Sequence, residues 1–161
     1  MQFIKVAKEI ASFAFWVLLT LVVATRFIGT AEVVGDSMLP TYKDGDLVFV
    51  LKTSFKPSYE DVLVVDCGDR CLIKRVIATG GSTVNIANGK VYVDGNVLNE
   101  PYITEPTFED TVEMPVKVSE DSLFLLGDNR TNSKDSRSSA IGLVSEKDVV
   151  GKVLFTIKRG K

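Results

Sequence analysis

The chain has 161 residues, of which 45% are hydrophobic and 25% charged, and its formal net charge is −2. This length and hydrophobic content support one domain with a hydrophobic core and exclude a wholly disordered chain. The slightly negative net charge argues against a basic nucleic-acid-binding protein. The sequence contains no histidine and only two cysteines, which excludes a Ser-His-Asp triad, a Cys-His dyad and a four-thiolate metal site.

An unbroken apolar segment lies near the N-terminus. Between residues 10 and 28 the only ionisable side chain is Arg26, and a helix needs roughly 20 apolar residues to cross a bilayer. Lys5 and Lys8 precede the segment, and basic residues favour the cytoplasmic side. We therefore expect a single-pass protein of the cell membrane, with a cytoplasmic N-terminus at residues 1–9, a transmembrane helix at 10–29 and an extracytoplasmic domain at 30–161.

Two other interpretations of this segment are weaker. A cleaved signal peptide also begins with basic residues, and Gly29-Thr30-Ala31 fits a small-x-small cleavage site. However, the apolar stretch is longer than is usual in signal peptides, and Arg26 would lie just before the cut. A buried core helix would show a polar face, which this segment lacks.

After Thr30 the pattern changes to short runs rich in β-branched residues, separated by turns. Asn88-Gly89 and Asp94-Gly95 favour the positive φ angles of tight hairpins, so residues 83–98 are predicted to form a meander. We expect a mainly β domain of folded-over antiparallel sheets, similar to a barrel. The predicted strands are Glu32–Val34, Asp46–Lys52, Val62–Asp66, Leu72–Thr79, Thr83–Ala87, Lys90–Val93, Val97–Leu98, Thr111–Val118, Ser122–Leu126 and Val149–Lys158.

Cys67 and Cys71 flank a turn-like triplet between two of these strands. If the strands pair as a hairpin, the cysteines lie at its neck, where they could form a disulfide outside the cytoplasm. Two free, partly buried thiols are the other interpretation, and the spacing alone does not decide between them.

Three segments carry polar residues suited to catalysis: Gly35–Thr41, the lysine-containing apolar strand Leu72–Ile77, and the polar loop Gly127–Arg137. Each has an ordinary explanation as a turn, an edge strand or a self-satisfied loop. Together they could supply a serine nucleophile and a lysine base. A lysine accepts a proton only when it is neutral, and apolar surroundings lower its pKa.

In this order, the segments resemble the signature motifs of bacterial type I signal peptidase, a family of serine–lysine proteases. The resemblance rests on Ser-Met-x-Pro-Thr, the Lys-Arg strand, Gly-Lys-Val-Tyr-Val-Asp-Gly followed by Glu-Pro-Tyr-Ile, and Gly-Asp-Asn-Arg-x-Asn-Ser-x-Asp-Ser-Arg. It covers nearly the whole chain and implies a short, single-span member without the large accessory β-domain of longer ones. The implied substrates are preproteins, cut after a small-x-small motif, with no cofactor and no metal.

The resemblance also implies the roles of individual residues. Ser37 is expected to be the nucleophile, Lys74 the general base, and Ser133 the hydroxyl that hydrogen-bonds the lysine amine. The amide of Ser37 would bind the oxyanion, whereas Gly35 replaces a serine that supplies a second donor in some members. An ion pair of Asp135 with Arg137 is expected to support the polar loop. Asp128 and Arg130 are expected to belong to the same supporting structure.

The apolar residues around the expected pair suggest how a substrate is chosen. They could form shallow pockets that admit alanine, and an extended peptide would add as a strand at the edge of the cleft. The short link from Arg26 to Gly35 places the site close to the lipid surface. The predicted pocket residues are Val33, Val34, Met38, Leu72 and Ile73.

Two other functions fit parts of this sequence. A self-cleaving regulator like the SOS repressors would use the same chemistry, but it needs a partner domain and an internal cleavage segment that this sequence does not show. A non-catalytic, membrane-tethered β-domain would not be expected to keep Ser37, Lys74 and Ser133 together.

Overall fold

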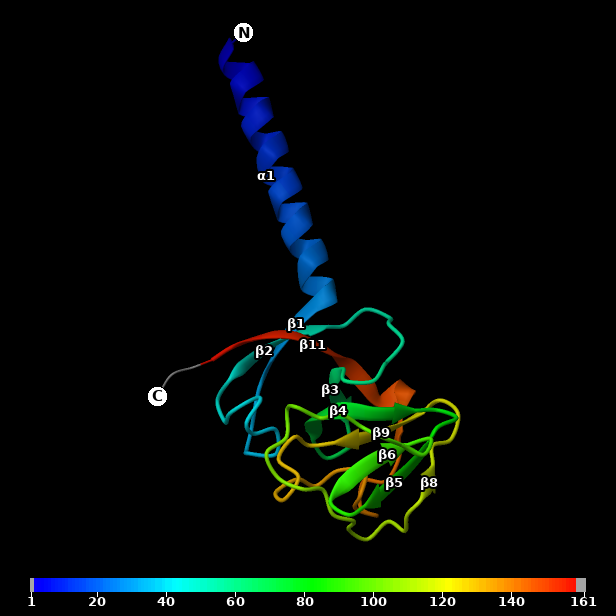
Figure 1. The fold of residues 1–161 in the computed structure, drawn as a ribbon. Helices are drawn as coiled ribbons and strands as arrows, with labels where there is room; N and C mark the ends of the chain where they lie inside the picture. The colour runs from blue at the N-terminus through cyan, green and yellow to red at the C-terminus, as the bar shows by residue number, and fades with distance from the viewer. Residues whose placement is uncertain (1, 159–161) are drawn as a thin grey trace.

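The computed structural model describes residues 2–158, and a single long helix stands away from a β-domain (Figure 1). Helix α1 spans Gln2–Phe27. By length and composition Phe3–Phe27 is able to cross a membrane, and its most apolar window is not buried against the rest of the protein. The helix differs from the expected 10–29 at both ends. It already includes most of the segment expected as a separate N-terminus, and it stops at Phe27 because Ile28 pairs with Leu51 in a sheet.

A seven-stranded sheet forms the larger part of the domain, and every neighbouring pair in it is antiparallel. The strand order is β1-β2-β11-β3-β4-β9-β10. Register shifts at Val153, Val149 and Val76 mark bulges, which bend strands and let a sheet curl over its own core. The strands are β1 (Ile28–Glu32), β2 (Leu47–Leu51), β3 (Val62–Asp66), β4 (Cys71–Thr79), β9 (Ser122–Leu126), β10 (Val144–Ser145) and β11 (Val149–Ile157).

A second, four-stranded sheet has the order β7-β6-β5-β8. Its two hairpins turn at Asn88-Gly89 and Asp94-Gly95, all with positive φ between 51° and 81°, which confirms the predicted meander. A short 3-10 helix, η1 (Glu146–Asp148), precedes β11. The strands are β5 (Thr83–Ala87), β6 (Lys90–Val93), β7 (Asn96–Val97) and β8 (Val116–Lys117).

Three clusters of buried apolar side chains hold the domain together. One joins the two sheets through residues such as Ile77, Val84 and Phe124. A second packs Met38 and Val33 against β2 and β3, and a third lies between β3, β4 and β9. The fold is therefore mainly β, with curled antiparallel sheets after one apolar helix, as the sequence predicts.

Several predicted strands differ from the structure. The strand expected at Glu32–Val34 is instead β1, because residues 28–31 leave the helix and pair with β2. Of the strand expected at Thr111–Val118, only Val116–Lys117 forms, since Pro115 has no N–H for a ladder. The two-residue strand β10 was not predicted; it is defined only by pairing with β9.

Candidate active site

Ser37 lies in the loop that joins β1 to β2. Met38, which is 1% exposed, anchors this loop in the core beside Val33. The carbonyl of Ser37 accepts a hydrogen bond from the amide of Asn129 at 3.1 Å, and the Asn129 side chain donates to the carbonyl of Asp36 at 3.0 Å. The loop of Ser37 is therefore held by the core through Met38 and by the polar loop after β9 through Asn129.

Lys74 lies on β4 opposite Leu63 of β3, and it is 3% exposed. Its Nζ is 2.8 Å from the Oγ of Ser37 and 2.9 Å from the carbonyl oxygen of Ile73. Burial lowers the pKa of Lys74, an effect that the charges of Asp135 and Asp128 oppose. The structure thus brings together two residues that lie 37 positions apart, with the amine in surroundings that favour its neutral form.

Arg75 is buried as well, although alternation along a strand predicts that only one of two neighbours faces inward. Both faces of β4 are covered at this point. The Arg75 guanidinium forms a two-point ion pair with Asp128, at 2.8 and 2.6 Å, and donates to the carbonyl of Glu60 at 3.0 Å. The ring of Tyr102 lies 4.0 Å from its central carbon.

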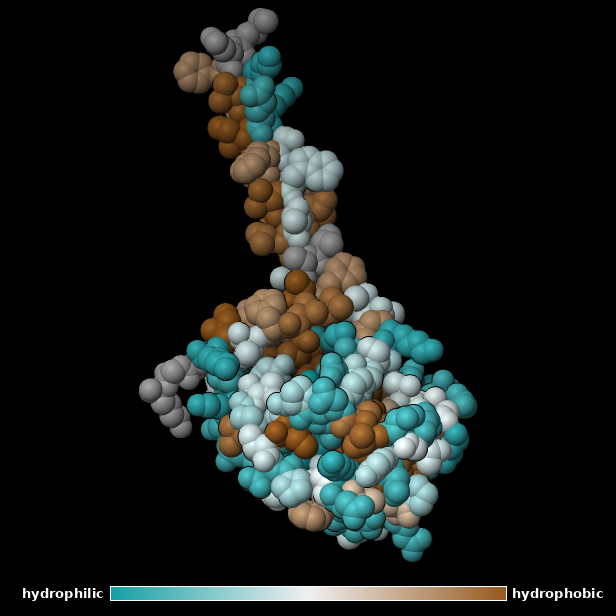
Figure 2. All heavy atoms as spheres, in the orientation of Figure 1, coloured by the Kyte–Doolittle hydropathy of each residue, from teal (hydrophilic) through white to brown (hydrophobic). Residues whose placement is uncertain are grey.

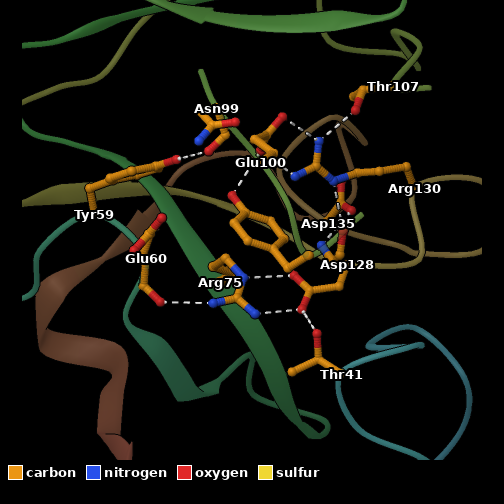
Figure 3. A network of polar contacts seen from close by, with 12 residues as sticks. Thr41, Tyr59, Glu60, Arg75, Asn99, Glu100, Thr107, Asp128, Arg130 and Asp135 are labelled. Carbon is orange, nitrogen blue, oxygen red and sulfur yellow. Dashed lines mark hydrogen bonds and ion pairs between the residues drawn. The ribbon is translucent and has the colours of Figure 1, made fainter. Parts of the chain in front are cut away.

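The polar network continues away from Arg75 (Figure 3). The Tyr102 hydroxyl donates to Glu100, which pairs with Arg130 at 2.5 Å, and Arg130 also donates to Thr107. Asp128 accepts a hydrogen bond from the Thr41 hydroxyl in the loop that carries Ser37. The contacts of Glu100, Tyr102, Thr107 and Thr41 were not predicted. Glu100 and Tyr102 lie in the quoted Glu-Pro-Tyr motif and Thr41 in Ser-Met-x-Pro-Thr, whereas Thr107 lies in none of the quoted motifs.

The expected ion pair between Asp135 and Arg137 is present, with oxygen–nitrogen distances of 2.8 and 2.9 Å. Asp135 also accepts the amide of Gly127 at 3.0 Å, and Arg137 donates to the carbonyl of Arg130 at 2.8 Å. Both charged side chains are almost fully buried. These contacts tie the two ends of the loop 127–137 together.

The hydrogen bond expected between Ser133 and Lys74 is not formed. The Oγ of Ser133 is buried and has no hydrogen-bond partner among residues 2–158. It packs over Gly127, where a built Cβ atom would lie 2.2 Å from it. The lysine amine is instead directed at Ser37 and at the carbonyl of Ile73.

A small pocket of about 90 Å³ adjoins the pair. Its wall includes all five residues predicted to flank the site, together with Ser37 and Lys74. The neighbouring strand ends Glu32 and Cys71 complete it. The predicted lining residues are Val33, Val34, Met38, Leu72 and Ile73.

The backbone geometry at Gly35 bears on oxyanion binding. Gly35 has φ +80°, and its amide donates to the carboxylate of Asp44 at 2.8 Å. This amide is therefore already occupied, and glycine has no side chain to act as the second donor.

Cys67 and Cys71 are free thiols. β3 and β4 do form the expected hairpin, with Asp66 paired to Cys71 and the amide of Cys67 bonded to the carbonyl of Arg70 at 2.9 Å. Cys67 directly follows the last pair of this ladder, Asp66–Cys71, so the alternation along a strand places its side chain on the face opposite to that of Cys71. Of the two interpretations left open by the sequence, the structure has the free thiols.

Comparison with known proteins assigns the family. Residues 6–158 match the family described as signal peptidase, peptidase S26. The chain is 39% identical to the probable signal peptidase I-1 of Synechocystis over 74% of its own length and 66% of that protein. It is 32% identical to signal peptidase I S of Bacillus subtilis, covering 86% of this chain and 82% of that one.

A solved structure agrees with these sequence matches. The crystal structure of a signal peptidase I from Enterococcus faecalis superimposes with a TM-score of 0.54 at 30% identity. The match covers 64% of this chain and 100% of the other. The mainly β fold, its N-terminal apolar helix and the matching sequences together show that this chain belongs to the signal peptidase family, peptidase S26, among the bacterial type I signal peptidases.

Proposed function

We propose that the protein is a membrane-bound serine endopeptidase that removes N-terminal signal peptides from exported preproteins. Ser37 is the nucleophile and Lys74 the general base. The observation that carries the proposal is the 2.8 Å approach of the Lys74 amine to the Ser37 hydroxyl. Burial lowers the pKa of this amine, which favours the form that accepts a proton.

The reaction follows from these positions. Neutral Lys74 takes the proton of the Ser37 hydroxyl as Oγ attacks the scissile carbonyl carbon, giving a tetrahedral intermediate. The amide of Ser37 donates to the oxyanion, and such a donor typically contributes about 2.7–4 kcal/mol to the transition state. The ammonium of Lys74 then protonates the leaving amine. A water molecule, deprotonated by Lys74, finally hydrolyses the acyl-enzyme and releases the cleaved signal peptide.

The pocket beside Ser37 supports a preference for small side chains. Its volume of about 90 Å³ suits alanine better than a large residue. Two strand edges border it. β1 ends the sheet, and β4 pairs with β9 only from Arg75 onward, so that Cys71–Lys74 have no neighbouring strand on that side among residues 2–158. An extended substrate can add between these edges, so that backbone hydrogen bonds provide affinity and the pocket selects residues.

The anchor and the domain surface support a site at the membrane. Apolar side chains gather where α1 meets the domain (Figure 2). Phe27, Ile28, Leu154, Phe155 and Ile157 are each 43% or more exposed, on the helix end, β1 and β11. We place α1 in the cell membrane with its basic N-terminal end in the cytoplasm, and residues 28–158 outside, against the lipid surface.

The test is cleavage of an alanine-ended preprotein by the full-length protein in lipid vesicles. Ser37→Ala and Lys74→Ala are expected to retain the fold and to lose processing. Lys74→Arg is expected to be inactive too, because a guanidinium stays charged and cannot act as a base. Substantial cleavage by any of the three variants, with circular dichroism unchanged, would reject the proposed pair.

A further inference from the structure

A hollow separate from the candidate active site lies beside the end of α1. It has a volume of about 260 Å³ and is bordered by the loop after β2 and by the first residues of β11. The amide of Lys52, which begins this loop, donates to the carbonyl of Phe27, the last residue of α1, at 2.8 Å. Figure 1 shows the loop after β2 beside the end of the helix. Because we place α1 in the membrane, the hollow lies at the depth of the lipid headgroups.

The hollow is lined by one positive and one negative side chain. Lys52 comes from the loop after β2 and Glu146 from η1, and no ion pair joins the two among residues 2–158. The hydroxyls of Thr53 and Ser54 border the same space, and they too have no hydrogen-bond partner within these residues. A ligand that carries both charges fits such a lining, whereas a purely anionic ligand would be repelled by Glu146.

The amine of Lys52 is held at the junction between the helix and the domain. Its side chain lies across Gly29, where a built Cβ atom would be 2.8 Å from Nζ and closer still to Cε. A glycine at position 29 therefore leaves room for the lysine just after the end of α1. An ammonium with hydroxyl donors beside it is suited to bind phosphate oxygens.

Apolar residues continue from the hollow onto the surface that we place against the lipid. Val150 lines the hollow and is 40% exposed, and further along the same strand Leu154 and Phe155 are exposed as well. The acyl chains of a phospholipid occupy the layer next to this surface, so its headgroup can reach the hollow while its chains stay in the bilayer. A soluble phosphate ester would make no use of the apolar surface.

We infer that this hollow binds the headgroup of a zwitterionic phospholipid, with its phosphate at the Lys52 amine and the neighbouring hydroxyls and its ammonium at Glu146. The inference rests on the membrane placement in the proposed function and deepens it. Lys52 is bonded to the end of α1, and β1 leads from there toward Ser37. A bound headgroup therefore fixes the height at which Ser37 stands above the bilayer.

The first test is native mass spectrometry of the full-length protein in detergent with added phosphatidylethanolamine or phosphatidylglycerol. The wild type is expected to retain phosphatidylethanolamine in preference. Lys52→Gln is expected to lower this retention about tenfold, the loss expected for one hydrogen bond between charged groups. Gly29→Ala displaces the amine without removing its charge and is expected to act in the same direction. Glu146→Gln is expected to retain both lipids equally.

Lys56→Gln is the matched control. Lys56 lies in the same exposed loop but does not border the hollow, so its loss is expected to leave lipid retention unchanged. The inference is overturned if the wild type retains both lipids equally, if Lys56→Gln lowers retention as much as Lys52→Gln, or if Glu146→Gln keeps the preference. Soluble glycerophosphoethanolamine is expected not to compete, and competition by it at an equal concentration would assign the hollow to a soluble ligand instead.

A second measurement separates this inference from the proposed function. In vesicles containing phosphatidylethanolamine, Lys52→Gln is expected to raise KM for a preprotein several-fold at unchanged kcat, and to cleave a short soluble peptide like the wild type. If Ser37→Ala cleaves the preprotein like the wild type, the proposed mechanism fails whichever lipid is bound. If Ser37→Ala is inactive but Lys52→Gln keeps wild-type lipid retention and KM, the mechanism stands and this inference fails.

Discussion

Gly127 is expected to be indispensable for activity because nothing larger fits between the two halves of the site. A Cβ atom at this position would lie 2.5 Å from the carbonyl oxygen of Ser37 and 2.6 Å from the Cβ of Ser133. The first of these atoms belongs to backbone, which is held in place by the amide of Asn129. Gly127→Ala must therefore push the loop of Ser37 away from the loop 127–137.

The size of the effect follows from the overlap. Contacts between carbon and oxygen atoms are normally well above 3 Å, so the Ser37 backbone must move by several tenths of an ångström. Forcing an extra methyl group into a packed core typically costs about 1–3 kcal/mol of stability. A displacement of about 1 Å at a reacting group can reduce the rate by ~100-fold, which corresponds to about 2.7 kcal/mol in the barrier.

Gly151 offers a matched control. It lies on β11, and a Cβ atom there would meet the carbonyl oxygen of Leu51 at 2.4 Å and a methyl group of Val50 at 2.6 Å. Gly151→Ala therefore introduces a clash of the same size against β2, which carries neither Ser37 nor Lys74. Melting temperature and kcat/KM of the folded protein are measured for both variants, with preprotein cleavage in lipid vesicles as the assay.

Both variants are expected to be destabilised to a similar degree, but only Gly127→Ala is expected to lose about two orders of magnitude in kcat/KM while folded. Wild-type kcat/KM in Gly127→Ala would refute this reasoning. An equal loss in Gly151→Ala would show that general destabilisation, rather than displacement of Ser37, reduces the activity.

Three other predictions concern titration, packing and thiol chemistry. Activity is expected to rise with pH through the lowered pKa of Lys74. The free energy of unfolding is also expected to rise with pH between that pKa and the ordinary value of 10.5, because over this range the unfolded chain binds more protons than the folded one. Lys74→Met is expected to remove this pH dependence in urea unfolding. Tyr102→Leu removes the ring over Arg75 and is expected to cost up to about 2 kcal/mol of unfolding free energy, whereas Tyr102→Phe keeps the ring and should cost less. Maleimide is expected to inhibit preprotein cleavage by alkylating Cys71, which is exposed and lines the pocket. Cys71→Ser should protect the enzyme from this inhibition, whereas Cys67→Ser should not. Inhibition that persists in Cys71→Ser would contradict the prediction.

Local sequence patterns predicted much of the fold. Val62–Asp66, Thr83–Ala87, Lys90–Val93 and Ser122–Leu126 have the predicted bounds, because short runs of β-branched and apolar residues between turns favour strands. The helix ends at Phe27 rather than at residue 29, and the first strand begins at Ile28 rather than at Glu32. An apolar run looks alike in a membrane helix and in a strand, and only the pairing of Ile28 with Leu51 separates them.

For a similar reason, the sequence predicted some residues and contacts of the candidate site but not others. Ser37, Lys74 and the Asp135–Arg137 pair lie in motifs that the sequence displays, and the structure places them together. The contacts of Tyr102 with Arg75 and of Glu100 with Arg130 were not predicted. They depend on the loop between β7 and β8 of the second sheet, which reaches these arginines only in the folded domain. The contact expected for Ser133 depends on a rotamer, which no motif specifies.

The sequence by itself determined the family, the apolar helix and the β-rich domain, and it supplied the candidate residues of the site, because these depend on composition, periodicity, motifs and residue type. Only the tertiary structure decided that Lys74 is buried with its amine at the Ser37 hydroxyl, that Asp128 and Asp135 are paired with arginines, and that Cys67 and Cys71 are free thiols. Burial, charge pairing and side-chain direction are set by segments distant in the chain, so these properties exist only once the sheets have folded over one another.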